Sequence, residues 1–332
     1  MQPETTDELV AAVSDVRADG GAVELRGGGS VLDRLPANDV PILSTSAIRG
    51  IVAHAAEDLT ITVRAGTPLD ELDEALAEHG QECPIEPIAG AGSTVGGRIA
   101  TGLAGPRQLS AGRVRDWLLR VRFVAGTGQH VMAGGVTVKD VTGYDLCRLV
   151  TGSWGTIGVI TEVTLKLRPL ARHRAWFATT EPRPDLDAQL FRPAALFTAS
   201  TGTHVLLEGH PDDAAAQAEL AGLEPATAPD LPVGARASVD PADLGALRSA
   251  LRELDVEVVT QDAVGVGYLD APATRLPDIR QVCEGLGGTL LVLDPESQLP
   301  AFGPGAAPDA MTERMTAALD PGGVFAPWRW QR

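Results

Sequence analysis

The sequence predicts an α+β protein built from two domains, and three observations lead to this prediction. The chain has 332 residues, more than the roughly 250–300 at which a single hydrophobic core stops growing. Hydrophobic residues make up 44% of it, beside 37 Gly and 24 Pro, a composition typical of a folded, loop-rich protein. Short strand-like and helix-like segments alternate along the chain, and from about residue 170 the strands become shorter and the helices richer in Ala.

The first half of the chain carries clear local signals. We expect one helix to begin with Thr6 as its N-cap and to end at Gly20. A second helix should open with Thr67 as N-cap and Pro68 at its first position, and end before Gly80. Alternating apolar residues and a glycine turn predict strands over residues 22–25, 60–64, 117–125, 129–132 and 159–167.

The second half has shorter strands, Ala-rich helices and linkers rich in Pro and Asp. We expect strands at 175–179, 204–208, 256–260 and 289–293, and helices at 211–221, 241–254 and 308–319. The domain boundaries that follow are 1–170 for the first domain and 171–310 for a smaller one with an antiparallel sheet. Residues 311–332 are expected to return to the first domain.

Charge and cysteine content exclude several classes of function. The formal net charge of −17 repels nucleic acid and anionic lipid, so neither is an expected partner. The three cysteines, Cys83, Cys147 and Cys283, form no C-x-x-C pair, so no cysteine-ligated iron–sulfur cluster or metal site is expected. No signal peptide pattern and no apolar run of membrane-spanning length occur, and the expected location is the cytoplasm.

Three blocks of small residues interrupt the ordinary elements. The first, Arg26–Ser30, places three glycines after a strand, where bare backbone N–H groups can approach an anion such as pyrophosphate. Taken alone, this block favours a simple tight turn over a phosphate loop. The second, Ala89–Gly102, buries too little apolar area to fill a core. Its glycine spacing is not that of a Rossmann fingerprint, because the preceding CPIEPIAG is a poor strand.

The third block, Gly152–Thr161, places glycines at three-residue spacing ahead of a strand. Alone, it could be a loop that turns into an edge strand. Three such blocks, separated by regular secondary structure, are hard to explain as turns alone. Together they indicate an extended ligand lying across one domain.

The segments RGGGS, EPIAGAGSTVGGRIATGLAGPRQLSAGRVRDW and KDVTGYDLCRLVTGSWGTIGVITE resemble the FAD domain of the vanillyl-alcohol oxidase / p-cresol methylhydroxylase (PCMH) superfamily. They are most similar to the E-type subunits of bacterial glycolate oxidases, and the resemblance is specific from about residue 20 to 170. It implies a PCMH-type FAD-binding domain of two α/β subdomains, followed by a smaller α+β substrate or cap domain.

The resemblance also implies which residues bind FAD. The first block would wrap the pyrophosphate, the second would line the pyrophosphate and ribityl chain, and the third would run beside the adenine and ribose. Arg113 follows the second block, although a surface ion pair with Asp116 explains it at least as well. The implied cofactor residues are Arg26, Gly27, Gly28, Gly29, Ser30, Gly92, Ser93, Thr94, Gly96, Gly97, Arg113, Gly155, Thr156, Gly158, Val159 and Ile160.

Other features bear on catalysis. Some members of the superfamily attach FAD to a histidine in the first loop, but Ser30 stands in that region here, so a noncovalent flavin is expected. The His-x-Gly-Asp-Gly-Asn motif of the larger catalytic subunits does not occur, and the closing motif has Ala326 where Asn is usual. The six scattered histidines suit structural roles, so no catalytic residue is assigned.

The function implied by the resemblance is that of an FAD-binding oxidoreductase subunit in a glycolate (2-hydroxy acid) oxidase or dehydrogenase complex. Electrons would pass from the flavin towards a D-type flavoprotein and an iron–sulfur subunit, because this chain lacks cluster-binding cysteines. Two alternatives stay open: a noncatalytic FAD-binding scaffold of that complex, and a stand-alone FAD-dependent alcohol or sugar oxidase. A UDP-N-acetylmuramate reductase is a minor further option.

Overall fold

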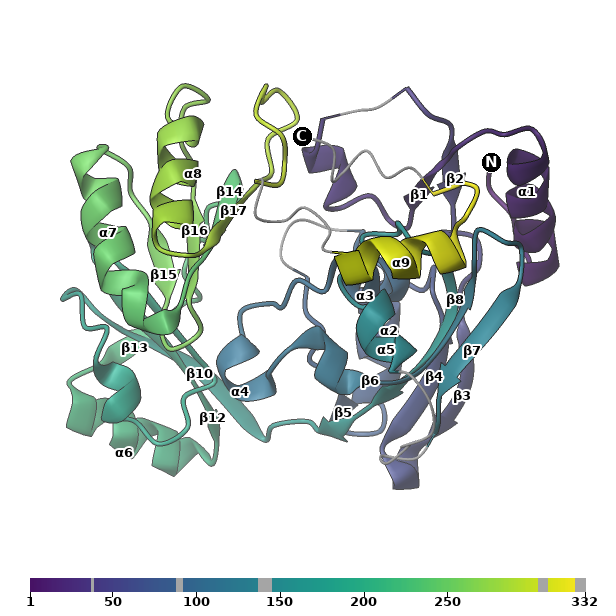
Figure 1. Ribbon diagram of the computed structural model, residues 1–332. Helices are drawn as coiled ribbons and strands as arrows, with labels where there is room; N and C mark the ends of the chain where they lie inside the picture. Colours follow the sequence, from purple (N-terminus) through teal and green to yellow (C-terminus); the bar gives the residue numbers. More distant parts are fainter. Residues whose placement is uncertain (37–38, 88–91, 137–144, 304–309, 326–332) are drawn as a thin grey trace.

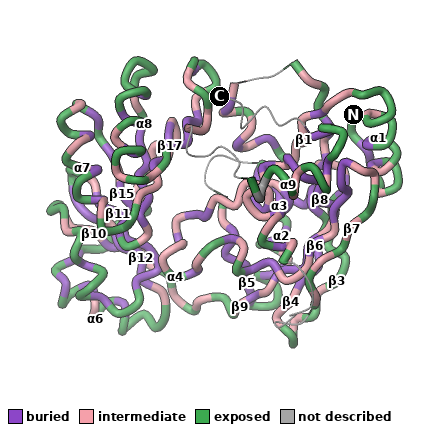
Figure 2. Tube along the Cα trace, in the orientation of Figure 1, coloured by how far each residue is buried: buried purple, intermediate pink, exposed green. Residues whose placement is uncertain are grey.

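The computed structural model describes residues 1–36, 39–87, 92–136, 145–303 and 310–325 (Figure 1). Two large antiparallel sheets dominate these residues, a five-stranded sheet from the first half of the chain and an eight-stranded sheet from the second. Helices pack against both sheets, so the predicted α+β class is confirmed. Buried residues follow the strands and the inward sides of the helices, whereas the outer sides of the helices are exposed (Figure 2).

The chain begins with a small layer beside the five-stranded sheet. Helix α1 (Thr6–Ala18) buries Leu9 and Val13, and packs beside a parallel pair of strands, β1 (Glu24–Arg26) and β2 (Ile42–Ser44). The first glycine block directly follows β1, so the position of β1 sets the position of that loop.

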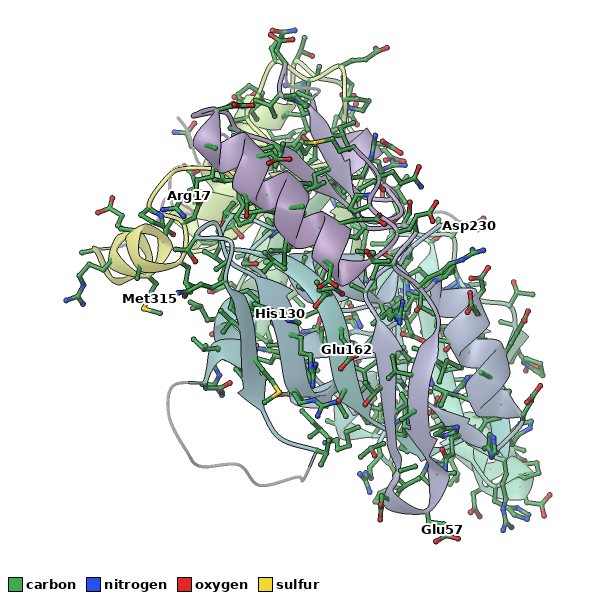
Figure 3. The ribbon with its side chains drawn as sticks, turned by 90° about the vertical axis from the view of Figure 1, so that its right-hand side faces the viewer. Arg17, Glu57, His130, Glu162, Asp230 and Met315 are labelled. Atoms are coloured by element: carbon green, nitrogen blue, oxygen red, sulfur yellow. The ribbon has the colours of Figure 1, made fainter. Side chains whose placement is uncertain are left out.

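The five-stranded sheet has the order β3-β4-β8-β6-β7. Its strands are β3 (Ile51–Ala55), β4 (Thr60–Arg64), β8 (Val159–Lys166), β6 (Leu118–Val124) and β7 (His130–Gly134). Figure 3 shows its outward face, on which Glu162 lies 3.5 Å from Arg120 and 3.3 Å from Arg122. The exposed face is therefore polar, as the alternation of β8 predicts.

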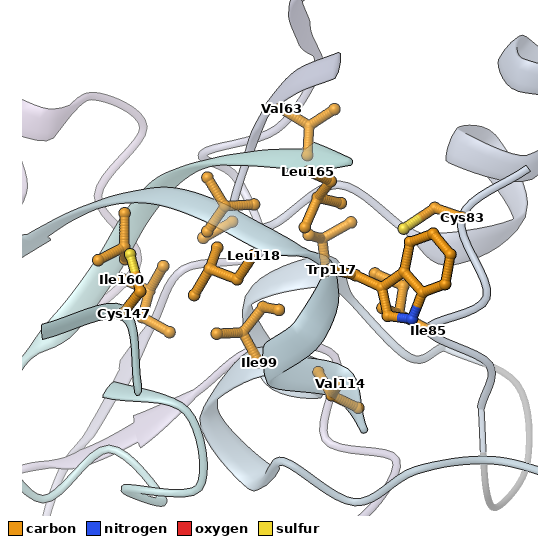
Figure 4. Close-up of a cluster of buried hydrophobic side chains, with 14 of the residues drawn as sticks. Val63, Cys83, Ile85, Ile99, Val114, Trp117, Leu118, Cys147, Ile160 and Leu165 are labelled. Atoms are coloured by element: carbon orange, nitrogen blue, oxygen red, sulfur yellow. The ribbon is translucent and has the colours of Figure 1, made fainter. Parts of the chain in front are cut away.

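The inward face of this sheet carries the first hydrophobic core (Figure 4). Ile160 and Leu165 of β8 pack there with Ile99, Val114 and other aliphatic residues. The helices on this side are α2 (Leu69–Ala77), α3 (Val95–Thr101), α4 (Gln108–Ala111) and α5 (Leu146–Val150). This core is mostly aliphatic, with Trp117 and Phe123 as its aromatic members, and it supports the glycine-rich segments from below.

The eight-stranded sheet has the order β13-β10-β12-β11-β15-β16-β14-β17, and all of its strand pairs are antiparallel. The strands are β10 (His173–Thr179), β11 (Ala195–Ala199), β12 (Gly202–Gly209), β13 (Glu224–Ala226), β14 (Ala235–Ser238), β15 (Val259–Gln261), β16 (Val266–Leu269) and β17 (Thr289–Val292). Helices α6 (Pro211–Ala221), α7 (Leu244–Glu253) and α8 (Leu276–Gly285) cover one face of it (Figure 1).

A network of six ionic side chains links the short two-stranded sheet β5-β9 to the eight-stranded sheet. The carboxylate of Glu82, in the short strand β5 (Gln81–Glu82), accepts hydrogen bonds from Arg107 at 2.7 Å, Arg168 at 2.8 Å and Arg174 at 2.9 Å. Glu208 on β12 accepts from the same three arginines at 2.7–3.2 Å, and Glu86 pairs with Arg107. Strand β9 (Arg168–Pro169), paired with β5, lies at this junction.

The last described residues run back towards the start of the chain. After helix α9 (Ala310–Leu319), Phe325 pairs in parallel with Val23, and the Val23 N–H donates to the Val324 carbonyl at 2.8 Å. Both Val324 and Phe325 are buried in the core beneath α1. This contact agrees with the expected return of the C-terminal segment, while the domain boundaries at 170 and 310 stay a prediction.

The ends of several elements differ from those expected. Thr5, and not Thr6, caps α1, because its Oγ1 accepts from the Glu8 N–H at 3.2 Å. Thr67 does not cap α2, whose N-cap is Pro68; the Thr67 hydroxyl instead accepts from the Gly50 N–H at 2.9 Å. The expected strand 256–260 begins only at Val259. Val256 and Val258 are apolar because their side chains pack in a hydrophobic core, and not because they belong to the strand.

Within the described part of the chain, none of the helices combines the length and the apolar character that a membrane crossing requires.

Candidate cofactor-binding site

The three glycine-rich blocks, far apart in sequence, meet at one cleft. The cleft has a volume of about 70 Å³ and opens to solvent. Its walls come from the loop after β1, from helix α3 and from the start of β8. The lining residues are Leu25, Arg26, Gly27, Gly28, Gly29, Ser30, Val31, Leu32, Thr45, Thr94, Gly96, Gly97, Arg98, Ala100, Thr101, Trp154, Gly155, Gly158, Val159 and Ile160.

The first two blocks touch through their backbones. A Cβ added to Gly28 would collide with the Gly92 carbonyl, and one added to Gly27 would collide with the Thr94 hydroxyl. The hydroxyls of Ser30 and Ser93 lie 2.9 Å apart and share a hydrogen bond. These positions therefore require glycine because the loops approach too closely for side chains, which a simple surface turn would not explain.

Helix α3 is held tightly against the end of β4. Thr94 caps it by accepting from the Gly97 N–H at 3.3 Å. The Gly96 N–H donates to the Ala65 carbonyl at 2.8 Å, and a Cβ on Gly96 would lie 2.7 Å from the Ala65 Cβ. The absence of a side chain at Gly96 thus lets the helix lie against the strand, with its first turn facing the cleft.

The third block closes the opposite wall. A Cβ on Gly155 would lie 3.2 Å from the Leu25 side chain, and one on Gly158 would lie 2.5 Å from the Phe123 ring. Trp154 has a left-handed φ of 55°, and its N–H donates to the Ala100 carbonyl at 2.8 Å. Backbone contacts of this kind fix the block against β1 and α3 before any ligand binds.

Arg98 is the buried cation of the cleft. It is 1% exposed, and its Nη2 donates to the Leu103 carbonyl. Its Nε and Nη1 have no hydrogen-bond partner among the described residues. Burial, followed by the nearby charge of Arg236, lowers its pKa to about 10, so it stays protonated at neutral pH. A buried guanidinium with two free donors is suited to an anionic ligand.

Most of the predicted cofactor residues line this cleft. Two others, Gly92 and Ser93, contact the first block from behind. Two lie elsewhere: the Thr156 hydroxyl donates to the Ser153 carbonyl at 2.7 Å, and Arg113 lines a different cavity. The predicted residues that line the cleft are Arg26, Gly27, Gly28, Gly29, Ser30, Thr94, Gly96, Gly97, Gly155, Gly158, Val159 and Ile160.

The predicted ion pair between Arg113 and Asp116 is replaced by a backbone contact. The Asp116 carboxylate accepts from the Arg113 N–H at 2.9 Å, and its ionic neighbour is Arg115 at 3.8 Å. Some residues that carry the family resemblance lie outside the described part of the chain. They are residues 88–91, residues 137–144 and Ala326 of the closing motif.

Sequence reasoning missed Arg98 and Trp154. Arg98 stands within the second block, and a single arginine among small residues is a signal that could have been used. Trp154 stands within the third block. Its ring packs edge-to-face on Phe302 at 4.9 Å between centroids, a long-range contact that no local pattern predicts.

Comparison with known proteins identifies the N-terminal part of the chain. Residues 1–134 match a protein family described as "FAD binding domain", and these residues contain the first two glycine blocks. This part of the chain is therefore similar to that FAD-binding family. The PCMH-type FAD-binding domain and the FAD cofactor expected from the sequence are thereby confirmed, whereas noncovalent attachment stays a prediction.

Several curated proteins are similar to parts of the chain. Glycolate oxidase subunit GlcE of Escherichia coli (strain K12) is 47% identical over 125 residues, 37% of this chain and 36% of that protein. The D-lactate dehydrogenase of Archaeoglobus fulgidus is 34% identical over 184 residues, 55% of this chain and 41% of that protein. The chain therefore matches well under half the length of these relatives.

Two solved structures share the whole fold. Both are alkyldihydroxyacetonephosphate synthase structures, with TM-scores of 0.67 and 0.68 at 13% and 14% sequence identity. The matches cover 100% and 98% of this chain and 76% of each synthase chain. At such low identity the likeness shows the fold alone, and it extends over both sheets.

Proposed function

We propose that this chain is an FAD-dependent oxidoreductase that acts on a small 2-hydroxy acid such as glycolate as one subunit of a larger complex. The observation that carries the proposal is the convergence of three glycine-rich segments on one cleft, in a chain whose first 134 residues match an FAD-binding family. The relatives named glycolate oxidase subunit GlcE, D-2-hydroxyglutarate dehydrogenase and D-lactate dehydrogenase support the substrate class.

The residues present fit an FAD molecule. Side chains at Gly27 and Gly28 would collide with the second block, so the first loop is free of side chains there. Bare backbone N–H groups could therefore face the pyrophosphate. Arg98 brings unpaired buried donors to the same cleft. The apolar walls formed by Leu25, Val159 and Ile160 would contact the less polar parts of the cofactor.

Bound FAD would supply the hydride-accepting chemistry that the side chains lack. The chain itself would bind and orient the cofactor, exclude water from the cleft and hold a positive charge at Arg98. Among the described residues that line the cleft, there is no histidine, aspartate or glutamate. A general base would therefore have to come from outside this lining.

Electron transfer out of the chain requires an acceptor. The three cysteines are buried, and the described residues contain no cluster of ligands that could hold a metal ion. We therefore propose that electrons pass to partner subunits of the D-type flavoprotein and iron–sulfur kinds. The relative named GlcD, 30% identical over 220 residues, supports an assembly of several subunits.

The cleft lining also favours a second candidate function. Because no acid–base side chain faces the cleft in the described part of the chain, the chain could hold FAD without oxidising a substrate. In that case it would be a scaffold subunit of the same complex, with the chemistry residing in a partner.

An absorbance spectrum of the purified protein, followed by anaerobic addition of glycolate, separates these functions. We expect a flavin band near ~450 nm that bleaches with glycolate and persists with glycolamide, its uncharged analogue. A band that persists with glycolate and D-lactate, even with the partner subunits present, would favour the scaffold. A protein that neither contains nor takes up FAD would contradict both.

A further inference from the structure

A second cavity lies between the segment around α4 and the eight-stranded sheet. One wall is the segment around α4, contributing Gly102, Ala104, Gln108 and Arg113. The other wall comes from β14 and β16 of the sheet, which contribute Arg236, Ser238 and Val266, and from the neighbouring Val239, Val264 and Gly265. We call this the junction cavity. Its volume is about 270 Å³, and it opens to solvent.

The charge at the junction cavity is unusual for this chain. Arg113 and Arg236 line it, and neither guanidinium forms an ion pair with a carboxylate of the described residues, since Asp116 accepts only from the backbone N–H of Arg113. Yet the chain contains 44 acidic residues and only 27 lysines and arginines. In a protein with such an excess of carboxylates, two arginines that line one cavity without a partner indicate a site for an external anion.

Arg98 adds a third positive charge from the cofactor side. It lines the cofactor cleft, and it donates to Leu103, which lies between two residues of the junction cavity. The charge of Arg236 is second only to burial among the causes that lower the Arg98 pKa. Glu86 acts in the opposite direction, but its carboxylate is already bound by Arg107. Arg98 thus stands between the two cavities.

Unpaired polar atoms mark the same place. The buried atoms without a hydrogen-bond partner include Arg98 Nε and Nη1, Arg236 Nε and Gln108 Oε1. Leaving such buried atoms unpaired is costly, and most costly where the group is charged. The arginines need an acceptor and the Gln108 oxygen needs a donor. In the junction cavity, a ligand that carries both an anionic oxygen and a hydroxyl hydrogen would satisfy Arg236 and Gln108.

We propose that the junction cavity binds a small carboxylate, held by Arg113 and Arg236, with Gln108 accepting a hydrogen bond from a hydroxyl next to that carboxylate. The valine side chains at 239, 264 and 266 leave an apolar wall that suits a short substituent on the ligand. This assignment rests on the proposed function for one point only, which is that the carboxylate is the 2-hydroxy acid substrate.

Isothermal titration of the FAD-loaded protein with oxalate tests the site, because oxalate presents carboxylates but has no hydroxyl for the flavin to oxidise. We expect saturable binding that weakens by roughly 10- to 100-fold in Arg236→Gln, which removes a charge-assisted hydrogen bond. Arg113→Gln should weaken it less, because Arg113 is exposed and solvent screens its charge. Arg236→Lys should bind with intermediate affinity, since it keeps the charge but loses the two-pronged geometry.

Arg275→Gln is the matched control, because Arg275 is an exposed arginine at the start of α8 and lies outside both cavities. It should bind oxalate as the unchanged protein does. Flavin absorbance and the midpoint of thermal unfolding show whether each variant keeps its cofactor and fold. Arg113→Gln keeps the test open if Arg236→Gln does not fold.

Unchanged oxalate affinity in folded Arg113→Gln and Arg236→Gln would overturn the assignment, as would equal binding of glycolamide or a preference for sulfate over oxalate. A protein that holds FAD but binds no oxalate would refute this site and leave the proposed FAD function intact. A protein that binds oxalate through Arg236 but holds no FAD would refute the proposed function and leave this site intact.

Discussion

Substitution of Gly96 by alanine tests whether helix α3 must lie directly on strand β4 to form the cofactor cleft. The new Cβ would lie 2.7 Å from the Ala65 Cβ and 2.9 Å from the Ala65 carbonyl oxygen, both closer than van der Waals contact permits. The helix would have to move away by several tenths of an ångström. Because Ala65 belongs to the core beneath the sheet, it cannot readily yield.

The expected cost has two parts. Overpacking a well-packed contact typically costs about 1–3 kcal/mol of unfolding free energy. The same movement stretches the hydrogen bond from the Gly96 N–H to the Ala65 carbonyl, now 2.8 Å long, whose net contribution is about 1 kcal/mol. We therefore expect Gly96→Ala to lower the free energy of unfolding by roughly 2–3 kcal/mol. If about 1.4 kcal/mol of this cost falls on the cofactor cleft, the affinity for FAD would weaken tenfold.

Chemical unfolding gives the stability, and titration with FAD monitored by flavin fluorescence gives the affinity. Gly245→Ala is the matched control, because Gly245 is also a helical glycine and its Cβ would meet nothing within 4 Å. That variant should gain about 0.5–1 kcal/mol from helix propensity and bind FAD unchanged. If Gly96→Ala is as stable as Gly245→Ala and binds FAD normally, the reasoning about the close approach is refuted.

Three further predictions concern the junction, the C-terminal segment and the cleft. Burial alone would raise the pKa of Glu82, but Arg107, Arg174 and Arg168 hold this pKa below its ordinary value of 4.5. Glu82→Gln should thus lower the free energy of unfolding by roughly 3 kcal/mol at pH 7. Urea titrations should show the difference in unfolding free energy between the variant and the unchanged protein shrinking as the pH falls below 4.5, because Glu82 then becomes protonated in the unchanged protein. A difference that stays constant with pH would argue against this pairing. Asp320 accepts from two backbone N–H groups at 2.8 and 2.9 Å. Asp320→Ala should therefore lower the free energy of unfolding by about 1–3 kcal/mol, and the thermal midpoint should fall with it. An unchanged midpoint would contradict the packing of the C-terminal segment described above. Trp154 lines the cleft, so FAD should quench tryptophan fluorescence. Trp154→Phe should remove much of that quenching, and full quenching in the variant would place the cofactor elsewhere.

Local patterns predicted most of the elements because their causes are local. Helix 211–221 was predicted with its observed bounds, since Pro211 begins it and Gly222 follows it. Errors arose where a residue had a distant partner. Thr67 follows the N-cap pattern, but its hydroxyl is bound to Gly50. Val256 and Val258 were taken as strand residues because they are apolar, whereas they pack against the core.

The candidate cofactor site was predictable to the extent that glycine is a local requirement. A loop that must pass close to another backbone needs glycine at that point, so Gly27 and Gly28 were recognisable without knowing what they touch. Arg113 was assigned to the same site because it follows the second block in the sequence. The structure places it in the junction cavity, since the intervening helix α4 carries the chain away from the cleft.

By itself, the sequence determined the α+β class, the glycine-rich segments and their resemblance to FAD domains, because propensity, turn chemistry and close backbone approach leave marks on neighbouring residues. Tertiary structure alone decided which segments share a cleft, where Arg98 is buried and which arginines converge without carboxylates. Contacts such as those of Arg107 with Glu208, 101 residues away, depend on how the two sheets pack. Packing between distant segments leaves no periodic mark in a single sequence.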